Sequence, residues 1–121
     1  MLIMHSINIK RIYLPAAEKT DGVRILVDRL WPRGVSKEHA KLDLWLKEIA
    51  PSTELRQWFH SDESGHRWKD FKEKYILELD KNPAVERLKN ILAKNETVTL
   101  LYAVHDEQHN HAVILKEFVT K

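Results

Sequence analysis

The stretch VDRLWPRGVSK, residues 27–37, ends an apolar run on an aspartate and then gathers residue types that bind anions. Arg29 and Arg33 carry planar guanidinium groups that match the paired oxygens of a phosphate or a carboxylate. Gly34 permits a close approach of the backbone or a positive φ angle. Trp31 can stack on a flat ligand or pack in the core. The stretch therefore predicts a ligand-binding loop that contains these four residues.

A purely structural role explains the same loop. Arg29 could pair with Asp28 or Asp43 instead, because ion pairs of this kind are common in proteins. Trp31 is more often a core residue than a stacking platform, since tryptophan is mostly buried. Asp28 could act as a general base or a metal ligand, but we expect it to be a salt-bridged structural residue, because the neighbouring arginine favours its charged form and lowers its pKa.

A second cationic segment, PSTELRQWFH, begins at Pro51. Ser52 suits the N-cap of a helix, and Arg56 lies one helical turn further along the same face. If that face looks toward the first loop, Ser52 and Arg56 bind the same ligand; otherwise Ser52 is a plain cap and Arg56 is solvated. His60 is a candidate proton carrier, because histidine titrates near neutral pH.

A third segment, HDEQHNH at residues 105–111, combines three histidines with an aspartate. Its spacing matches no standard metal motif, so we predict no metal site. Asn110 suits the N-cap of a final helix, whose free N–H groups could also bind an anion. Asp106 and His111 are further candidate proton carriers if the protein catalyses a reaction.

The fold has to bring these three segments together. Apolar, β-branched runs predict strands over 7–14, 24–28 and 97–104, and the last is apolar enough to be covered on both faces. Helices are predicted between and after these strands. They should begin after Ser36, at Ser52 or Thr53, at Ser61 or Ser64, at Asn82–Pro83 and at Asn110.

The first of these helices is expected to carry Leu42, Trp45, Leu46 and Ile49 at helical spacing and to end before Pro51.

This order of elements predicts one α/β domain over 1–121, with a small, mostly parallel sheet flanked by helices. Because a helical crossover usually joins parallel strands, 24–28 and 97–104 should be parallel neighbours. Their carboxyl ends would then bring the loop 29–34 beside the loop 105–110. Open α/β sheets bind their ligands at this edge, so we predict one shared pocket there.

The composition fits a compact domain, with 43% hydrophobic and 31% charged residues among 121. The absence of cysteine excludes disulfides, thiolate metal sites and cysteine nucleophiles. No apolar run reaches the length of a membrane helix, and the first residues lack the basic region of a signal peptide. We therefore predict a cytoplasmic protein with no membrane partner.

Several motifs in order along the chain, RILVDRLWPRG, APSTELRQWFH, WKDF with YILEL, and TLLYAVHDEQHNHAVILKEF, resemble the YeaO-like family of small bacterial proteins. The resemblance spans residues 7–118 and implies a one-domain α/β fold of unknown function. It implies no activity, so the cofactor is unknown and the question of catalysis stays open. The matching polar or unusual positions are Arg29, Trp31, Arg33, Gly34, Pro51, Ser52, Arg56, His60, Asp106, Asn110 and His111.

The leading hypothesis is a protein that binds a small phosphate- or carboxylate-bearing ligand at the carboxyl edge of the sheet. A nucleic-acid-binding module, with Trp31 or Trp58 stacking on bases, is a first alternative. The net charge of +2 argues against it, because dedicated nucleic-acid binders are more basic. A protein-interaction domain that contacts an acidic partner is a second alternative. Self-association stays open, since an edge strand could pair with a second copy.

Overall fold

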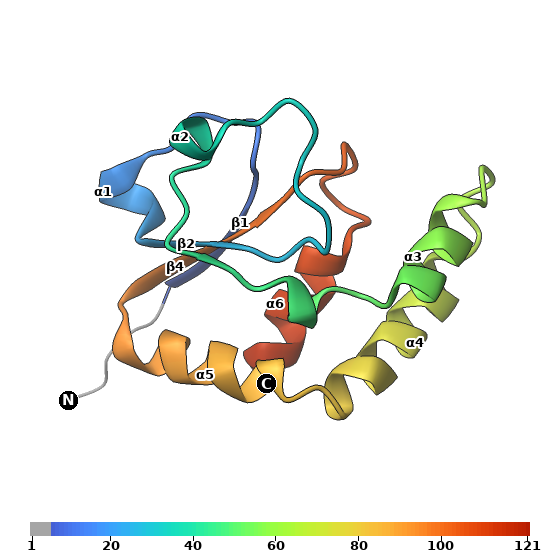
Figure 1. The fold of residues 1–121 in the computed structure, drawn as a ribbon. Helices are drawn as coiled ribbons and strands as arrows, with labels where there is room; N and C mark the ends of the chain where they lie inside the picture. The colour runs from blue at the N-terminus through green and yellow to red at the C-terminus, as the bar shows by residue number, and fades with distance from the viewer. Residues whose placement is uncertain (1–5) are drawn as a thin grey trace.

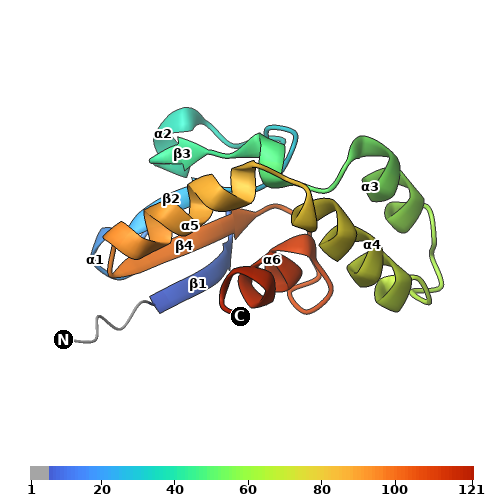
Figure 2. The same cartoon turned by 90° about the horizontal axis from the view of Figure 1, so that it is seen from below.

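Four parallel strands form the sheet, in the order β1-β4-β2-β3 (Figure 2; Figure 1 shows the fold from another side). The computed structural model describes residues 6–121; the first five residues, on which the expectation about a signal peptide depends, lie outside this range. The strands are β1 (Ser6–Arg11), β2 (Val23–Leu26), β3 (Leu44–Trp45) and β4 (Thr97–Tyr102). The predicted α/β domain with a small parallel sheet is confirmed.

The central strand β4 pairs with β1 on one side and with β2 on the other, so the predicted parallel pairing of β2 and β4 is also confirmed. Leu100 and Leu101 are both fully buried, in two different clusters. Because successive side chains of a strand point to opposite faces, these two leucines show that both faces of the sheet are covered. This explains why the sequence of β4 is apolar without alternation.

One face of the sheet is covered by α5 (Ala84–Lys94) and α6 (His111–Val119), as Figures 1 and 2 show. The opposite face carries α2 (Lys37–Ala40) and the loop before it, while α1 (Glu18–Asp21) precedes β2. The predicted cap of the last helix is present, since the Asn110 side chain accepts a hydrogen bond from the Val113 N–H at 3.1 Å. The Asn82–Pro83 start of α5 is present too: the Asn82 side chain accepts from the Ala84 N–H.

Two further helices, α3 (Thr53–His60) and α4 (Trp68–Asp80), lie beyond the carboxyl ends of the strands (Figures 1 and 2). They pack on each other through Phe59 and Phe71, whose stacked rings have centroids 4.1 Å apart. Helix α4 also contacts α6. The helical pair therefore forms a wall in front of the sheet edge at which the sequence predicts a ligand site.

The helix predicted through residues 42–49 is wrong. Ser36 does cap a helix, through the His39 N–H, but α2 ends at Ala40, and Lys41 adopts a left-handed conformation with φ 45°. The chain then forms β3 beside β2 and the short 3-10 helix η1 (Lys47–Ile49). The free edge of β2 explains the outcome, because its backbone groups bind the backbone of this segment.

The apolar residues of this segment consequently divide between the two faces of the sheet. Leu42 and Trp45 pack in one cluster, whereas Leu46 and Ile49 belong to the other. Their spacing resembles that of a helical stripe by coincidence.

Helix α4 begins at Trp68, later than the predicted Ser61 or Ser64. Asp62 accepts hydrogen bonds from the Ser64 N–H and hydroxyl, and Gly65 has φ 75°, so the chain turns here before the helix starts. Within residues 6–121 no helix has both the length and the apolar character needed to cross a lipid bilayer.

Candidate functional site

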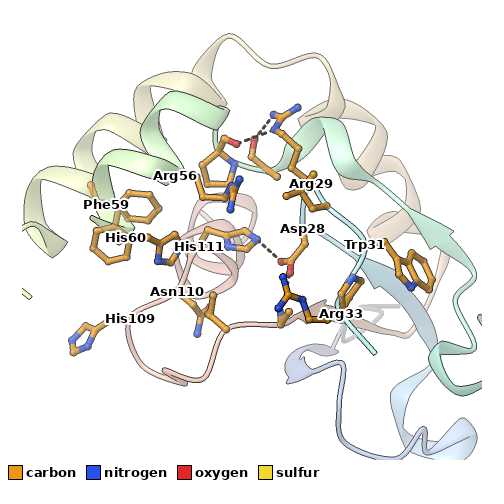
Figure 3. A pocket seen from close by; sticks show the side chains of 17 residues that line it. Asp28, Arg29, Trp31, Arg33, Arg56, Phe59, His60, His109, Asn110 and His111 are labelled. Atoms are coloured by element: carbon orange, nitrogen blue, oxygen red, sulfur yellow. Dashed lines mark hydrogen bonds and ion pairs between the residues drawn. The ribbon is translucent and has the colours of Figure 1, made fainter. Parts of the chain in front are cut away.

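A cavity of about 230 Å³ lies at the carboxyl ends of β2 and β4 (Figure 3). Its wall comes from the loop after β2, from the start and inner face of α3, and from the connection between β4 and α6. The lining residues are 28–33, Ala50, Pro51, Arg56, Phe59, His60, Phe71, Ala103, Val104 and 109–111. The two loops that the topology predicts to be neighbours thus line the same cavity.

Arg29 ties two of these segments together. Its Nε atom donates to the Pro51 carbonyl at 3.1 Å, and Nη2 donates to the Ala50 carbonyl at 3.0 Å. These carbonyl groups follow the end of η1, where Pro51 interrupts the backbone. They therefore take no part in helical hydrogen bonds and can accept from Arg29. The alternative in which Arg29 pairs with Asp28 or Asp43 is wrong, because within residues 6–121 its guanidinium group donates to these two carbonyls.

Two other arginines of the cavity wall are not engaged in this way. Among residues 6–121, the guanidinium groups of Arg33 and Arg56 have neither a hydrogen bond nor an ion pair. The Nε atom of Arg56 is buried without an acceptor. A buried N–H group that lacks its partner costs about 1–3 kcal/mol. In Figure 3, Arg56 and Arg33 lie on opposite sides of Asp28 and His111.

Asp28 and His111 connect β2, β4 and α6 in the middle of the wall. Oδ2 of Asp28 accepts from the Ala103 N–H at 3.0 Å, and Oδ1 lies 3.1 Å from Nε2 of His111. The same Nε2 atom lies 2.9 Å from the carbonyl oxygen of Val27. The Val27 carbonyl oxygen is the hydrogen-bond acceptor for Nε2 of His111, because Oδ1 of Asp28 is buried without a hydrogen bond. The contact with Oδ1 becomes an ion pair when His111 is protonated.

His60 extends from the last turn of α3 into the same wall. Partial burial lowers the pKa of its imidazole below 6.5, and the positive charge of Arg56 and the proximity of His111 lower that pKa further. Asp28 acts in the opposite direction. The lowered pKa favours the neutral form of the His60 imidazole at pH 7.

Asp106 lies in the connection between β4 and α6 and faces its own backbone. The N–H groups of His109 and Gln108 donate to its Oδ1 atom and lower the pKa of the carboxyl group. It lines an adjoining hollow rather than the cavity. Asn110 is 98% buried and uses its side chain to cap α6 and to bind the Asp106 carbonyl. Asn110 therefore contributes to the cavity by fixing the position at which α6 begins.

Ser52 and Gly34 lie off the cavity wall. The Ser52 hydroxyl donates to Glu78 at 2.6 Å and accepts from the Leu55 N–H, so the cap interpretation accounts for it. Gly34 has φ 77°, a conformation that explains the glycine without a ligand.

Trp31 packs edge-on against Trp45, with ring centroids 5.4 Å apart, and its Nε1 atom donates to the Val35 carbonyl. It nevertheless lines the cavity on one side. Trp31 therefore has the packing role expected of a core residue and also forms part of the wall.

Sequence reasoning missed several residues of the wall, among them Asp28, Leu30 and Phe59. For Asp28 the sequence favours a structural role over that of a general base or a metal ligand. Phe59 could have been found, because Arg56, Phe59 and His60 lie at positions i, i+3 and i+4 of one helix and hence share a face. Nothing in the sequence marks Leu30. Within residues 6–121 no three His, Asp or Glu side chains lie close enough together to hold a metal ion.

The chain matches a family model described as "Inactive DUF488-N3 subclade" over residues 6–121. It is 44% identical over 114 residues to the uncharacterized protein YeaO of Escherichia coli, which covers 94% of this chain and 96% of that protein. It is 32% identical to the uncharacterized protein Rv3073c of Mycobacterium tuberculosis, with 93% and 92% covered. No solved structure matches significantly. The chain therefore belongs to the YeaO-like family, within the inactive DUF488-N3 subclade.

Proposed function

We propose that the protein binds a small phosphate- or carboxylate-bearing anion in the cavity at the carboxyl edge of the sheet. The observation that carries the proposal is the pair of guanidinium groups on the cavity wall, those of Arg33 and Arg56, that have no partner among residues 6–121. An oxyanion could accept hydrogen bonds from the guanidinium group of Arg56 on α3 and from that of Arg33 in the loop after β2.

The charge balance of the wall supports an anion. Three arginines line the cavity against one carboxylate, that of Asp28, which faces His111. Much of the remaining lining is apolar or aromatic, and a poorly hydrated surrounding strengthens the attraction between an arginine and an anion. The volume of about 230 Å³ is smaller than the roughly 300–1,000 Å³ of pockets for drug-sized ligands. A small ligand fits these dimensions best.

The proposal is one of binding without catalysis. Among residues 6–121, the cavity wall includes no serine, threonine, lysine or cysteine that could act as a nucleophile. His111 already donates through Nε2 to a backbone carbonyl, and Asp106 is held as a carboxylate outside the cavity. The description of the matched family as inactive agrees with this interpretation.

Calorimetric titration with inorganic phosphate and with acetate, at constant ionic strength adjusted with chloride, tests the proposal. We expect the wild type to bind at least one of these anions, and we expect Arg56→Met and Arg33→Met to bind it roughly tenfold or more weakly, because a hydrogen bond to a charged group contributes about 1.5–3 kcal/mol. Arg87→Met is the matched control, since Arg87 is an exposed residue of α5 and does not line the cavity.

Two outcomes would contradict the proposal. One is an absence of phosphate and acetate binding to folded wild-type protein. The other is an equal loss of affinity in Arg87→Met and Arg56→Met, which would point to a general effect of net charge.

A further inference from the structure

Part of the cavity wall is apolar. Leu30 and Pro32 contribute to it from the loop after β2, Phe59 from α3, and Val104 from the chain that follows β4. These side chains offer no hydrogen bond to a ligand. Their natural complement is a hydrocarbon group, because apolar surface gains free energy when it is removed from water.

The volume of the cavity points the same way. A water molecule occupies about 30 Å³ in the liquid, so a cavity of about 230 Å³ has the volume of roughly seven or eight water molecules. An inorganic phosphate or an acetate ion would fill only a fraction of this space. A hydrocarbon group that replaces water against Leu30 and Phe59 would gain free energy by removing apolar surface from water.

Two of the apolar side chains are also arranged to receive a partner. Leu30 is 61% exposed, and of the four large hydrophobic residues that are exposed among residues 6–121 it is the one on the cavity wall. Phe59 is half-buried, and its ring is held by stacking on the buried Phe71 at an interplanar angle of 17°. The wall thus presents one uncovered aliphatic group and one fixed aromatic ring.

We infer that the ligand of this cavity is a small amphiphilic anion, in which one phosphate or carboxylate group is joined to a compact ring or branched alkyl group. The oxygens meet Arg33 and Arg56, and the hydrocarbon lies against Leu30, Phe59 and Val104. This inference rests on the proposed function, because the same arginines bind the anionic end, and it adds the chemical class of the rest of the ligand.

Matched pairs of anions test the inference on the full-length protein. Calorimetric titration compares phenyl phosphate with inorganic phosphate, and benzoate with acetate, so that each pair keeps the anionic group and differs in the ring. We expect the aromatic member to bind at least ~10-fold tighter in the pair whose anionic group the arginines accept, from burial of the ring. The two pairs distinguish a phosphate ligand from a carboxylate ligand.

Leu30→Gln is the informative variant. It should reduce the preference for the aromatic anion several-fold and leave the affinity for the parent anion unchanged, because Leu30 contacts the hydrocarbon part alone. Leu77→Gln is the matched control: Leu77 is 63% exposed on α4 and lies off the cavity wall, so this variant should keep the full preference. Circular dichroism checks that both variants fold.

The outcomes separate the two proposals. Equal binding of both members of each pair, or an unchanged preference in Leu30→Gln, overturns the inference while the proposed anion site stands. Binding of phenyl phosphate or benzoate that Arg56→Met and Arg33→Met do not weaken overturns the proposed function itself, since the arginines would then play no part. A preference that falls equally in Leu30→Gln and Leu77→Gln also overturns the inference.

Discussion

The Nε2 atom of His111 lies 3.1 Å from Oδ1 of Asp28 and 2.9 Å from the carbonyl oxygen of Val27. Both neighbours of this nitrogen are acceptors in their ordinary states, so Nε2 must carry the hydrogen when the imidazole is neutral. Since His111 begins α6 and Asp28 follows β2, the contact also fixes the helix start against the sheet edge.

This arrangement predicts the tautomer of His111. Nitrogen-15 NMR of the imidazole at pH 8 should show the hydrogen on Nε2, and a spectrum with the hydrogen on Nδ1 would contradict the described geometry. Asp28→Asn should destabilise the fold by about 1–3 kcal/mol in urea unfolding. If its amide oxygen accepts from the Ala103 N–H, its amide hydrogens face the Nε2–H group, and two donors meet.

The two glycines Gly22 and Gly34 should respond very differently to substitution by alanine. Both have positive φ, at 63° and 77°. A Cβ atom at Gly22 would lie 2.1 Å from the backbone oxygen of Thr97, whereas one at Gly34 would meet no atom within 4 Å. We expect Gly34→Ala to cost about 1–2 kcal/mol, from backbone conformation alone.

Gly22→Ala should cost roughly 3 kcal/mol or more, because β2 must move away from β4 to relieve the contact. Thermal or urea unfolding of the two variants side by side gives the comparison. Equal destabilisation of both would show that the close approach of Gly22 to β4 is absent in solution.

The buried carboxylate of Asp21 should make the fold sensitive to acid. Burial raises the pKa of this group, but hydrogen bonds from the Ala17 N–H, Lys10 and Arg24 outweigh burial, and the pKa falls below its usual value of 3.8. A group with a lowered pKa in the folded state adds stability above the pKa of the unfolded chain. That stability is lost as the pH falls through the lower, folded-state pKa.

The variant Asp21→Asn should therefore lose about 3–5 kcal/mol at neutral pH, because the Arg24 side chain, which is 3% exposed, keeps its charge without a counter-ion. Urea unfolding between pH 2 and pH 7 should show the difference from wild type shrinking below pH 4. A difference that stays constant over this range would contradict the assigned role of the carboxylate.

The sequence predicts correctly that the loops after β2 and β4 lie together at the carboxyl edge of the sheet. Local patterns and the rule that a helical crossover joins parallel strands lead to the same arrangement. The apolar run of β4, the crossover to it from β2 and the cap at Asn110 are all local or topological signals, and they bring Arg29 and Asn110 to one cavity. Arg56 also lies on the cavity wall, but Ser52, which helical spacing predicts to share its face, does not.

What the sequence could not supply depends on contacts between distant segments. The strand β3 forms because the β2 edge needs a partner, and that need overrides a spacing typical of a helix. The partners of Arg29 are the carbonyls of Ala50 and Pro51, which no side-chain pattern marks. The division of Ser52 and Arg56 between two different surfaces of α3 likewise becomes visible only once α4 has packed beside it.

His60 should report directly on the charge of the cavity. Partial burial is the largest cause that lowers its pKa below 6.5, and the charge of Arg56 is the next. In an NMR titration, Arg56→Met should raise the pKa of His60 but not restore it to 6.5, because the burial remains. Arg87→Met should leave it unchanged, and saturating wild type with phosphate should raise it, since a bound anion stabilises the imidazolium ion.

The same shift predicts how stability depends on pH. Because the folded-state pKa of His60 lies below that of the unfolded chain, its contribution is fully present above pH 6.5 and declines as the pH falls through the lowered value. His60→Gln should remove this part of the slope in urea unfolding between pH 5 and pH 8. If Arg56→Met leaves the pKa of His60 where it is in wild type, the guanidinium does not act on this part of the cavity, and the proposed anion site loses its main support.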